Sequence, residues 1–341
     1  MKKSFVLTMV LFIAFGFGLL LQANQASAKT IELKFAHPYS PMHPQHRKVF
    51  VPWAKKLEKK TNGQLKIKFI PGGALGKPGQ AYSVVEKGIA DITFDIQDYS
   101  PGRFPLTSVF ELPFMIKSAE KASVAFWKTY AKTPALQKEY DSTKVLWLNV
   151  HSPGGFTSMK KPIRTLDDLK GMKMRTASAF VTKALRIFES VPVTMPITEV
   201  YTSLERGVVD GTVLIYDGIT VFKLDDLLKY VTAADFYTMT FFVTMNKNKY
   251  NALPDDVKKV IDANSGEMMS MISGRQNEQE TVAARKTCLA KGLEEIQFSQ
   301  ADTQKLIQMT MPLRDEWVKE MEAKGLPGKA VLETALQYLA E

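Results

Sequence analysis

Apolar positions between residues 31 and 94 recur with two different periods. Leu65, Ile67 and Phe69 alternate with polar residues, and this two-residue period is typical of a half-exposed strand. An apolar residue every fourth position after residue 47 predicts one face of a helix. The elements expected in this part of the chain are strands at 31–36, 65–70 and 90–94 and helices at 47–60 and about 79–87. Strands that alternate with helices along the chain predict a parallel or mixed sheet with helices on both faces.

The alternation of strands and helices starts again after an expected strand at 144–150. The elements predicted next are a capped helical turn at 165–169, strands at 172–174 and 211–215, and helices at about 180–190 and 198–206. No internal sequence repeat accompanies this rhythm. Two similar α/β lobes are therefore the expected architecture, and ligands usually bind in the cleft between such lobes.

A long helical stretch is predicted at 254–291. Pro254 and the two acidic residues after it are a typical start signal, and an apolar stripe with helical spacing follows. At 1.5 Å per residue the helix would be roughly 57 Å long, enough to lie across both lobes. A kink or a break at Gly266 or Gly274 would shorten it. The tail from about residue 302 is again expected to be helical.

The first 28 residues have the pattern of an export signal. Two lysines precede an apolar run at 5–21, and Ala26-Ser27-Ala28 fits a cleavage site of small residues. This order is typical of a secretory signal peptide, here residues 1–28, that is removed from the mature protein. The alternative is a membrane anchor, since the run is about long enough to span a bilayer, but the cleavage site favours removal. A periplasmic location is therefore expected.

The formal net charge of +10 raises the question of an anionic partner. Lysines and arginines are scattered and carry no nucleic-acid recognition motif, so no nucleic acid is expected. The densest group, at 55–60, reads as the solvated face of a helix. The charge favours the approach of an anionic ligand. Cys288 is the single cysteine, which excludes a disulfide scaffold.

Motifs that carry catalysis or bind cofactors are missing from the sequence. His37, His43 and His46 lie close together in a proline-rich loop, but their spacing is weak evidence for a metal site. The glycine-rich segment 72–77 has one residue too few for a phosphate-binding loop, and Pro78 stands where Ser or Thr is needed. Neither G-x-S-x-G nor H-E-x-x-H occurs. We expect no metal and no cofactor, and a binding protein rather than an enzyme.

Arg175 is the strongest candidate for a ligand contact. It follows directly after the short strand expected at 172–174, and in open α/β sheets the carboxyl ends of strands face the ligand crevice. Its planar guanidinium can hold a carboxylate through two parallel hydrogen bonds. The alternative is an arginine paired with an internal Asp or Glu. Spacing alone does not decide between the two interpretations.

Several segments occur in an order that resembles one known family. They include LKFAH (33–37), WAKKLEKKTNG (53–63), PGGALG (71–76), KGIADI (87–92), FELPF (110–114), DLKGMKMR (168–175), EVYTSL (199–204) and GVVDG (207–211). The chain resembles the DctP-type solute-binding proteins of tripartite ATP-independent periplasmic (TRAP) transporters. The resemblance covers essentially the whole mature chain.

The resemblance implies a periplasmic solute-binding-protein fold of two α/β lobes that close on a ligand, with hinge strands and a long helix spanning both. Lobe I would comprise 29–150 plus about 235–270, and lobe II 151–234 plus about 271–341. It also implies delivery to a permease with small and large membrane subunits, driven by an ion gradient. Arg175 matches the family's carboxylate-binding arginine. A monomer is expected.

Two departures from the family pattern bear on the ligand. Many members continue the Asp-Gly of 210–211 with Gln-Glu-Asn-Pro, whereas this chain has Thr-Val-Leu-Ile, and residues 152–157 lack a second arginine that some members carry. One arginine with Phe156, Leu214 and Tyr216 nearby would suit a monocarboxylate with an apolar or aromatic body.

Four further residues at expected strand ends are secondary candidates for ligand contacts: His37, Phe94, Asp98 and Phe236. The main alternative function is an exported enzyme, a lyase or hydrolase acting on a small carboxylate, with Asp98 or His37 as general base. A third alternative is a structural or adhesion protein, but such a protein would not need the expected cleft.

Overall fold

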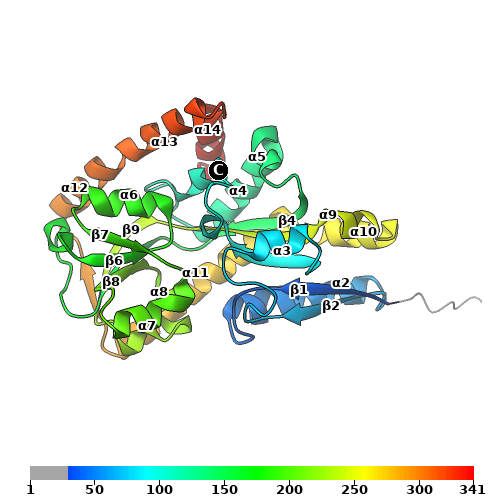
Figure 1. The fold of residues 1–341 in the computed structure, drawn as a ribbon, viewed down its shortest axis with the longest axis horizontal. Coiled ribbons are helices and arrows are strands. Elements are labelled where there is room, and N and C mark those ends of the chain that lie inside the picture. The colour runs from blue at the N-terminus through cyan, green and yellow to red at the C-terminus, as the bar shows by residue number, and fades with distance from the viewer. Residues whose placement is uncertain (1–29) are drawn as a thin grey trace, which may run out of the picture.

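The computed structural model describes residues 30–341, so the expected signal peptide lies outside the described residues. Two β-sheets, each covered by helices, form two lobes (Figure 1). This arrangement confirms the predicted two-lobe α/β fold. Among the described residues, no helix combines the length and apolar character needed to cross a membrane.

The first lobe is built on a five-stranded mixed sheet. Its strands, in spatial order, are β2 (Leu65–Ile70), β1 (Ile31–Ala36), β3 (Ile92–Ile96), β10 (Thr240–Asn246) and β4 (Thr143–Val150). β1 pairs in parallel with β2 and β3, whereas β10 pairs antiparallel with β3 and β4. The predicted parallel or mixed sheet is therefore a mixed one, because β10 enters it from the second half of the chain.

Three α-helices of the first lobe lie within the stretches predicted to be helical, 47–60, about 79–87 and 254–291, whereas the others were not assigned from the sequence. The helices of this lobe are α2 (Val51–Lys60), α3 (Ala81–Glu86), α4 (Ala119–Lys132), α5 (Pro134–Lys138), α9 (Lys247–Asn251) and α10 (Asp255–Ala263), with short helical turns η1 (His46–Phe50), η2 (Gln97–Tyr99) and η3 (Thr107–Glu111). Trp53 and Leu57 are buried on one face of α2, as their four-residue spacing predicts. The indole Nε1 of Trp53 donates a hydrogen bond of 2.8 Å to the Asn264 carbonyl, which ties α2 to the end of α10.

The second lobe contains a six-stranded mixed sheet. Its strands, in spatial order, are β11 (Glu294–Gln297), β9 (Tyr230–Tyr237), β5 (Gly154–Ser158), β8 (Gly211–Leu214), β6 (Lys173–Thr176) and β7 (Val191–Thr194). The helical elements between them are η4 (Leu166–Leu169), α6 (Ala179–Ile187), η5 (Ile197–Glu199), α7 (Val200–Glu205), α8 (Tyr216–Val221) and η6 (Leu224–Asp226). The predicted capped turn is present, because Thr165 and Asp168 form a reciprocal capping box before η4.

Two short connections join the sheets. β4 runs into β5 through residues 151–153, and β9 runs into β10 through residues 238–239. The connections are bonded to each other, since the Thr238 hydroxyl donates to the His151 carbonyl at 2.7 Å and the His151 amide donates to the Met239 carbonyl at 3.3 Å. Neither β9 nor β10 was assigned from the apolar pattern.

The long helical stretch is divided at the first of the two glycines singled out in the sequence. α10 ends at Ala263, and α11 (Glu267–Ala290) starts after Gly266, whose φ of 66° favours glycine. The 24 residues of α11 span about 36 Å and pack against α4 and α8, one from each lobe (Figure 1). The helix that spans both lobes is thus confirmed, although it is shorter than expected.

Gly274 does not interrupt α11; it allows a close crossing with α4. A Cβ atom at this position would lie 2.4 Å from the Ala119 carbonyl oxygen and 2.6 Å from Ser123 Oγ. Real side chains do not approach so closely, so the two helix backbones meet because residue 274 has no side chain.

The helical tail consists of α12 (Gln300–Thr310), α13 (Pro312–Ala323) and α14 (Gly328–Leu339). α12 packs against α6 of the second lobe, whereas α14 packs against α4 of the first. Residues 328–339, which the sequence analysis groups with lobe II, therefore contact the helical layer of the first lobe.

Candidate functional site

A cavity lies between the two lobes and is lined by residues from both. The empty space between its walls, open mouth included, is about 610 Å³. The lining residues are Tyr39, His43, Gln45, Phe94, Ile96, Tyr99, Asn149, His151, Arg175, Ile197, Leu214, Ile215, Asp217, Gly218, Val221, Phe222, Tyr237, Met239, Phe241 and Asn277.

Arg175 lies on β6 at the wall of this cavity and is only 2% exposed. Its Nε donates to the Met195 carbonyl at 3.0 Å, and its Nη2 lies 3.5 Å from the Tyr99 hydroxyl. Within residues 30–341, no Asp or Glu forms an ion pair with it, so the alternative of an internal carboxylate partner finds no support. A buried cation without a counter-ion is costly, and an anion in the cavity would remove that cost.

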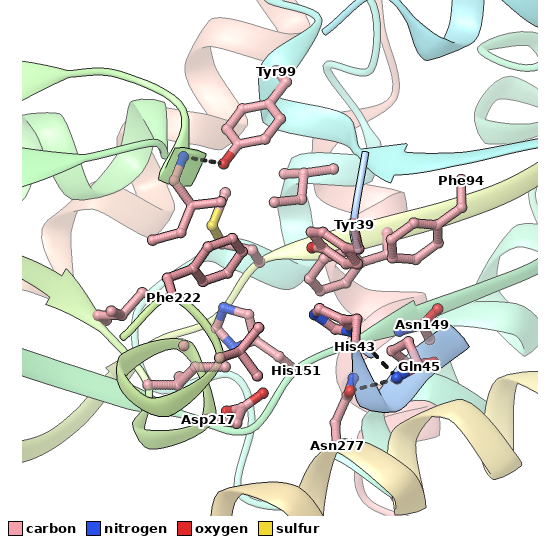
Figure 2. A pocket seen from close by; sticks show the side chains of 18 of the residues that line it. Tyr39, His43, Gln45, Phe94, Tyr99, Asn149, His151, Asp217, Phe222 and Asn277 are labelled. Atoms are coloured by element: carbon pink, nitrogen blue, oxygen red, sulfur yellow. Dashed lines mark hydrogen bonds between the residues drawn. The ribbon is translucent and has the colours of Figure 1, made fainter. Parts of the chain in front are cut away.

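Tyr99 links the lobes beside Arg175. It belongs to η2 of the first lobe, and its hydroxyl oxygen accepts a 3.0 Å hydrogen bond from the Ile197 amide of the second lobe (Figure 2). Burial raises the pKa of Tyr99, and the charge of Arg175 opposes that rise in part. The phenol is therefore protonated at neutral pH and can donate to an anion held by Arg175.

Aromatic rings form the middle of the cavity. The Tyr39 ring centroid lies 5.4 Å from that of Phe94 and 6.2 Å from that of Phe222, while Phe94 and Phe241 stack at 5.5 Å. Phe222 comes from the second lobe and the other three from the first. Figure 2 shows the rings of Tyr39, Phe94 and Phe222 between Tyr99 on one side and a group of polar side chains on the other. The space between them suits a flat, apolar body.

The polar side of the cavity carries little formal charge. Burial lowers the pKa of His43 to about 3 and that of His151 to about 4, so both imidazoles are neutral at pH 7. Burial also raises the pKa of Asp217 to about 7, and its Oδ1 accepts a 3.1 Å hydrogen bond from the Thr281 hydroxyl. This side therefore offers two neutral imidazoles and a carboxyl group that is about half ionised at pH 7, rather than a second cation.

Three of the eight predicted site residues line the cavity together: Arg175, Leu214 and Phe94. Arg175 and Leu214 lie at or next to the carboxyl ends of β6 and β8, whereas Phe94, which was expected at a strand end, is the central residue of β3. Some of the cavity residues that sequence reasoning missed are close in sequence to predicted ones, such as Tyr39, two residues after His37, and Tyr99, directly after Asp98. Phe222 and Asn277 had no signal in the sequence.

The other five predicted residues lie elsewhere. The rings of Phe156 and Phe236 stack on each other at 4.9 Å in the core. Tyr216 is the first residue of α8, and its hydroxyl donates to the Glu295 carboxylate. His37 shares a 2.9 Å hydrogen bond with His46, and Asp98 accepts from the Ala179 amide at 3.2 Å.

The histidine-rich loop does not form a metal centre in the described structure. His43 stacks on Tyr39 at 3.8 Å, away from the bonded pair formed by His37 and His46. Across residues 30–341, no three His, Cys, Asp or Glu side chains are grouped to hold a metal ion.

Two carboxyl groups meet where the lobes touch outside the cavity. Asp98 accepts from the Ala179 amide, and Glu111 accepts from the Ser178 hydroxyl at 3.1 Å, so two first-lobe acids bond the start of α6 in the second lobe. Glu111 also accepts from the amide and the hydroxyl of Thr240. Burial raises the pKa of both acids, and the proximity of Asp98 raises that of Glu111 further.

This pair predicts a pH dependence of stability. A carboxyl group whose pKa is higher in the folded state stabilises the fold most below its unfolded pKa, near 4.3, and the contribution is lost as the pH rises through the folded pKa. We expect the melting temperature of the wild type to fall between pH 5 and pH 8 by more than that of Glu111→Gln. Both are measured by calorimetry, and the difference isolates Glu111 from the other buried acids. Equal pH dependence in the two proteins would contradict this assignment.

Comparison with known proteins identifies the family to which this chain belongs. Residues 35–320 match the family described as bacterial extracellular solute-binding protein, family 7. A TRAP solute-binding protein from Rhodoferax ferrireducens, solved with copurified benzoate, is 33% identical, with a TM-score of 0.87 over 91% of this chain and 98% of that chain.

Two further solved TRAP solute-binding proteins are similar over the same range. One, from a marine metagenome and specific for aromatic acid ligands, is solved with metahydroxyphenylacetate; it is 34% identical, with a TM-score of 0.87 over 91% of this chain and 98% of that chain. The other, from Bordetella bronchiseptica with bound mandelate, is 26% identical, with a TM-score of 0.85 over 91% and 99%. These matches confirm the resemblance seen in the sequence. The chain therefore belongs to family 7 of the bacterial extracellular solute-binding proteins and is a DctP-type solute-binding protein of a TRAP transporter.

Proposed function

We propose that this protein binds an aromatic monocarboxylate in the cavity between its lobes and delivers it to the small and large membrane subunits of a TRAP permease. The observation that carries the proposal is a buried arginine without a carboxylate partner at one end of a cavity walled by aromatic rings.

Arg175 and Tyr99 would bind the carboxylate. The guanidinium already donates Nε to a backbone carbonyl, which fixes its plane, and Nη2 lies beside the Tyr99 hydroxyl. A charged hydrogen bond contributes about 1.5–3 kcal/mol. Because Tyr99 also bonds Ile197 across the lobes, a bound carboxylate would stabilise contact between them.

The rings of Tyr39, Phe94 and Phe222 would hold the body of the ligand. Burial of an apolar body contributes about 25 cal/mol per Å², offset by the cost of immobilising it. The polar side of the cavity has no cation to pair with a second carboxylate, which disfavours dicarboxylates. The bound benzoate, metahydroxyphenylacetate and mandelate in similar proteins belong to the proposed ligand class.

The competing function is an enzyme that acts on a small carboxylate. Its proposed general bases, His37 and Asp98, both lie outside the cavity that contains Arg175. The relatives named above are transport binding proteins. Both observations favour binding without turnover.

A titration of the mature protein tests the proposal. Benzoate and phenylacetate are compared with succinate and glucuronate by calorimetry and thermal shift. An aromatic acid at 100 times its dissociation constant should stabilise the fold by about 2.7 kcal/mol, and the two control acids should not. Recovery of the ligand unchanged supports a binding protein. Preference for succinate or glucuronate, or conversion of the ligand, would overturn the proposal.

A further inference from the structure

Asn149 presents two unpaired amide atoms at the cavity. The residue lies on β4, lines the cavity and is 1% exposed, yet neither its Nδ2 nor its Oδ1 has a hydrogen-bond partner within the described structure. A buried polar group left unpaired costs about 1–3 kcal/mol, and native proteins rarely tolerate one without a reason. Here one side chain has both a donor and an acceptor unpaired.

Gln45 adds a second unpaired acceptor to the same side of the cavity. Its Nε2 donates to Asn277 Oδ1 at 2.5 Å, and Asn277 in turn donates to the Val150 carbonyl at 2.8 Å. These bonds fix the amide of Gln45, which is 5% exposed, so its Oε1 is left without a partner. The side chain is held in place by the protein, while its acceptor remains available.

This polar group lies across the aromatic rings from the proposed carboxylate site. Figure 2 shows Gln45, Asn149 and Asn277 together on one side of the cavity and Tyr99 on the other, with the rings of Tyr39 and Phe222 between. Arg175 belongs to the Tyr99 side, since its Nη2 lies 3.5 Å from the Tyr99 hydroxyl. A flat ligand whose carboxylate meets Arg175 would therefore point its opposite edge at Asn149.

We propose that Asn149 and Gln45 form a second subsite that binds a hydroxyl group on the ring of the ligand, so that hydroxyaryl carboxylates are preferred over unsubstituted ones. The inference rests on the proposed function. A phenolic hydroxyl is a donor and an acceptor at once, so it can donate to Gln45 Oε1 or Asn149 Oδ1 and accept from Asn149 Nδ2. A second carboxylate could not donate, and a methyl group would leave all three atoms unpaired.

The titratable groups near the subsite favour a neutral substituent on the ligand over an anionic one. His43, His151 and Asp217 also line the cavity, and the lowered pKa values of both histidines keep this side free of cations at pH 7. A site built to bond a hydroxyl discriminates strongly against an analogue that lacks it, because its own polar groups then stay unpaired.

Calorimetry with benzoate, 3-hydroxybenzoate and 4-hydroxybenzoate, repeated on Asn149→Leu, tests the subsite. We expect the wild type to bind one hydroxylated acid at least tenfold more tightly than benzoate. Asn149→Leu should lose more affinity for the hydroxylated acid than for benzoate, so that the preference falls to within about threefold. Gln45→Met removes the unpaired acceptor and should also reduce the preference for the hydroxylated acid. If Asn149→Leu fails to fold, Gln45→Met tests the subsite in its place.

Benzoate affinity separates the two proposals. A wild type that binds benzoate and both hydroxybenzoates equally, or an Asn149→Leu or Gln45→Met variant that retains the full preference, would refute the hydroxyl subsite and leave the aromatic monocarboxylate site standing. If none of these aromatic acids binds, the proposed function itself fails, and the subsite fails with it.

Discussion

Arg175→Ala is expected to weaken the binding of an aromatic monocarboxylate by at least about 30-fold, corresponding to a loss of 2 kcal/mol or more. The variant loses the charge and the guanidinium donors at the cavity wall, while the ligand carboxylate still leaves water on binding. Without ligand, the Arg175→Ala variant should be nearly as stable as the wild type. The reason is that a buried arginine for which the described residues supply no carboxylate partner contributes weakly to the stability of the fold. Calorimetric titration measures the affinity and a melt measures the stability.

Two further variants make this result specific. Arg175→Lys retains the charge but loses the planar fork and the Nε bond to Met195, so an intermediate affinity is expected. Arg206→Ala removes an exposed arginine from the same lobe and should bind like the wild type. Wild-type affinity in Arg175→Ala would show that the carboxylate binds elsewhere.

Gly274→Ala is expected to lower the stability by about 3 kcal/mol, the upper part of the range for overpacked cores. Helix propensity alone predicts the opposite, since alanine is better than glycine inside a helix by about 1 kcal/mol. The steric effect should dominate because the new Cβ would meet the Ala119 carbonyl of α4 at 2.4 Å, and backbone yields less readily than a side chain. The melting temperature should fall by about 6 °C.

Val282→Ala provides the matched control for helix propensity. Val282 lies on the same helix and is 72% exposed, so its replacement changes propensity without changing a packed contact. Its melting temperature should stay within about 1 °C of the wild type. A Gly274→Ala protein as stable as the wild type would mean that α4 and α11 separate at little cost.

Helices and strands that are specified by a local sequence pattern could be predicted from the sequence. β1 and β2 match the predicted strands residue for residue, because alternation and turn residues bound them on both sides. Arg175 was identified for the same reason, as it comes at the end of a short strand that a glycine turn precedes. β10 was not predicted, since it is buried at every position and shows no alternation, and β9 was not predicted because its buried and exposed positions do not alternate regularly.

The remaining cavity residues depend on geometry that the sequence does not encode locally. Tyr216 was expected near the ligand together with Leu214, but it is the first residue of α8 and its hydroxyl donates to Glu295, whereas the next residue, Asp217, lines the cavity. Phe222 and Asn277 reach the cavity because the lobes and α11 come together in three dimensions. Phe156 and Phe236 were expected there as aromatic residues near strand ends, yet sheet packing stacks them in the core.

The position of β10 sets the order in which the exported chain can complete its folding. β10 lies between β3 and β4, so residues 30–150 alone contain two separate parts of a sheet and no strand that joins them. The joining strand is translated about ninety residues later, after most of the second lobe. Such long-range pairing slows folding, since a large loop must close before the pairing contributes. The first lobe therefore cannot finish folding as an independent N-terminal domain and has to wait for β10.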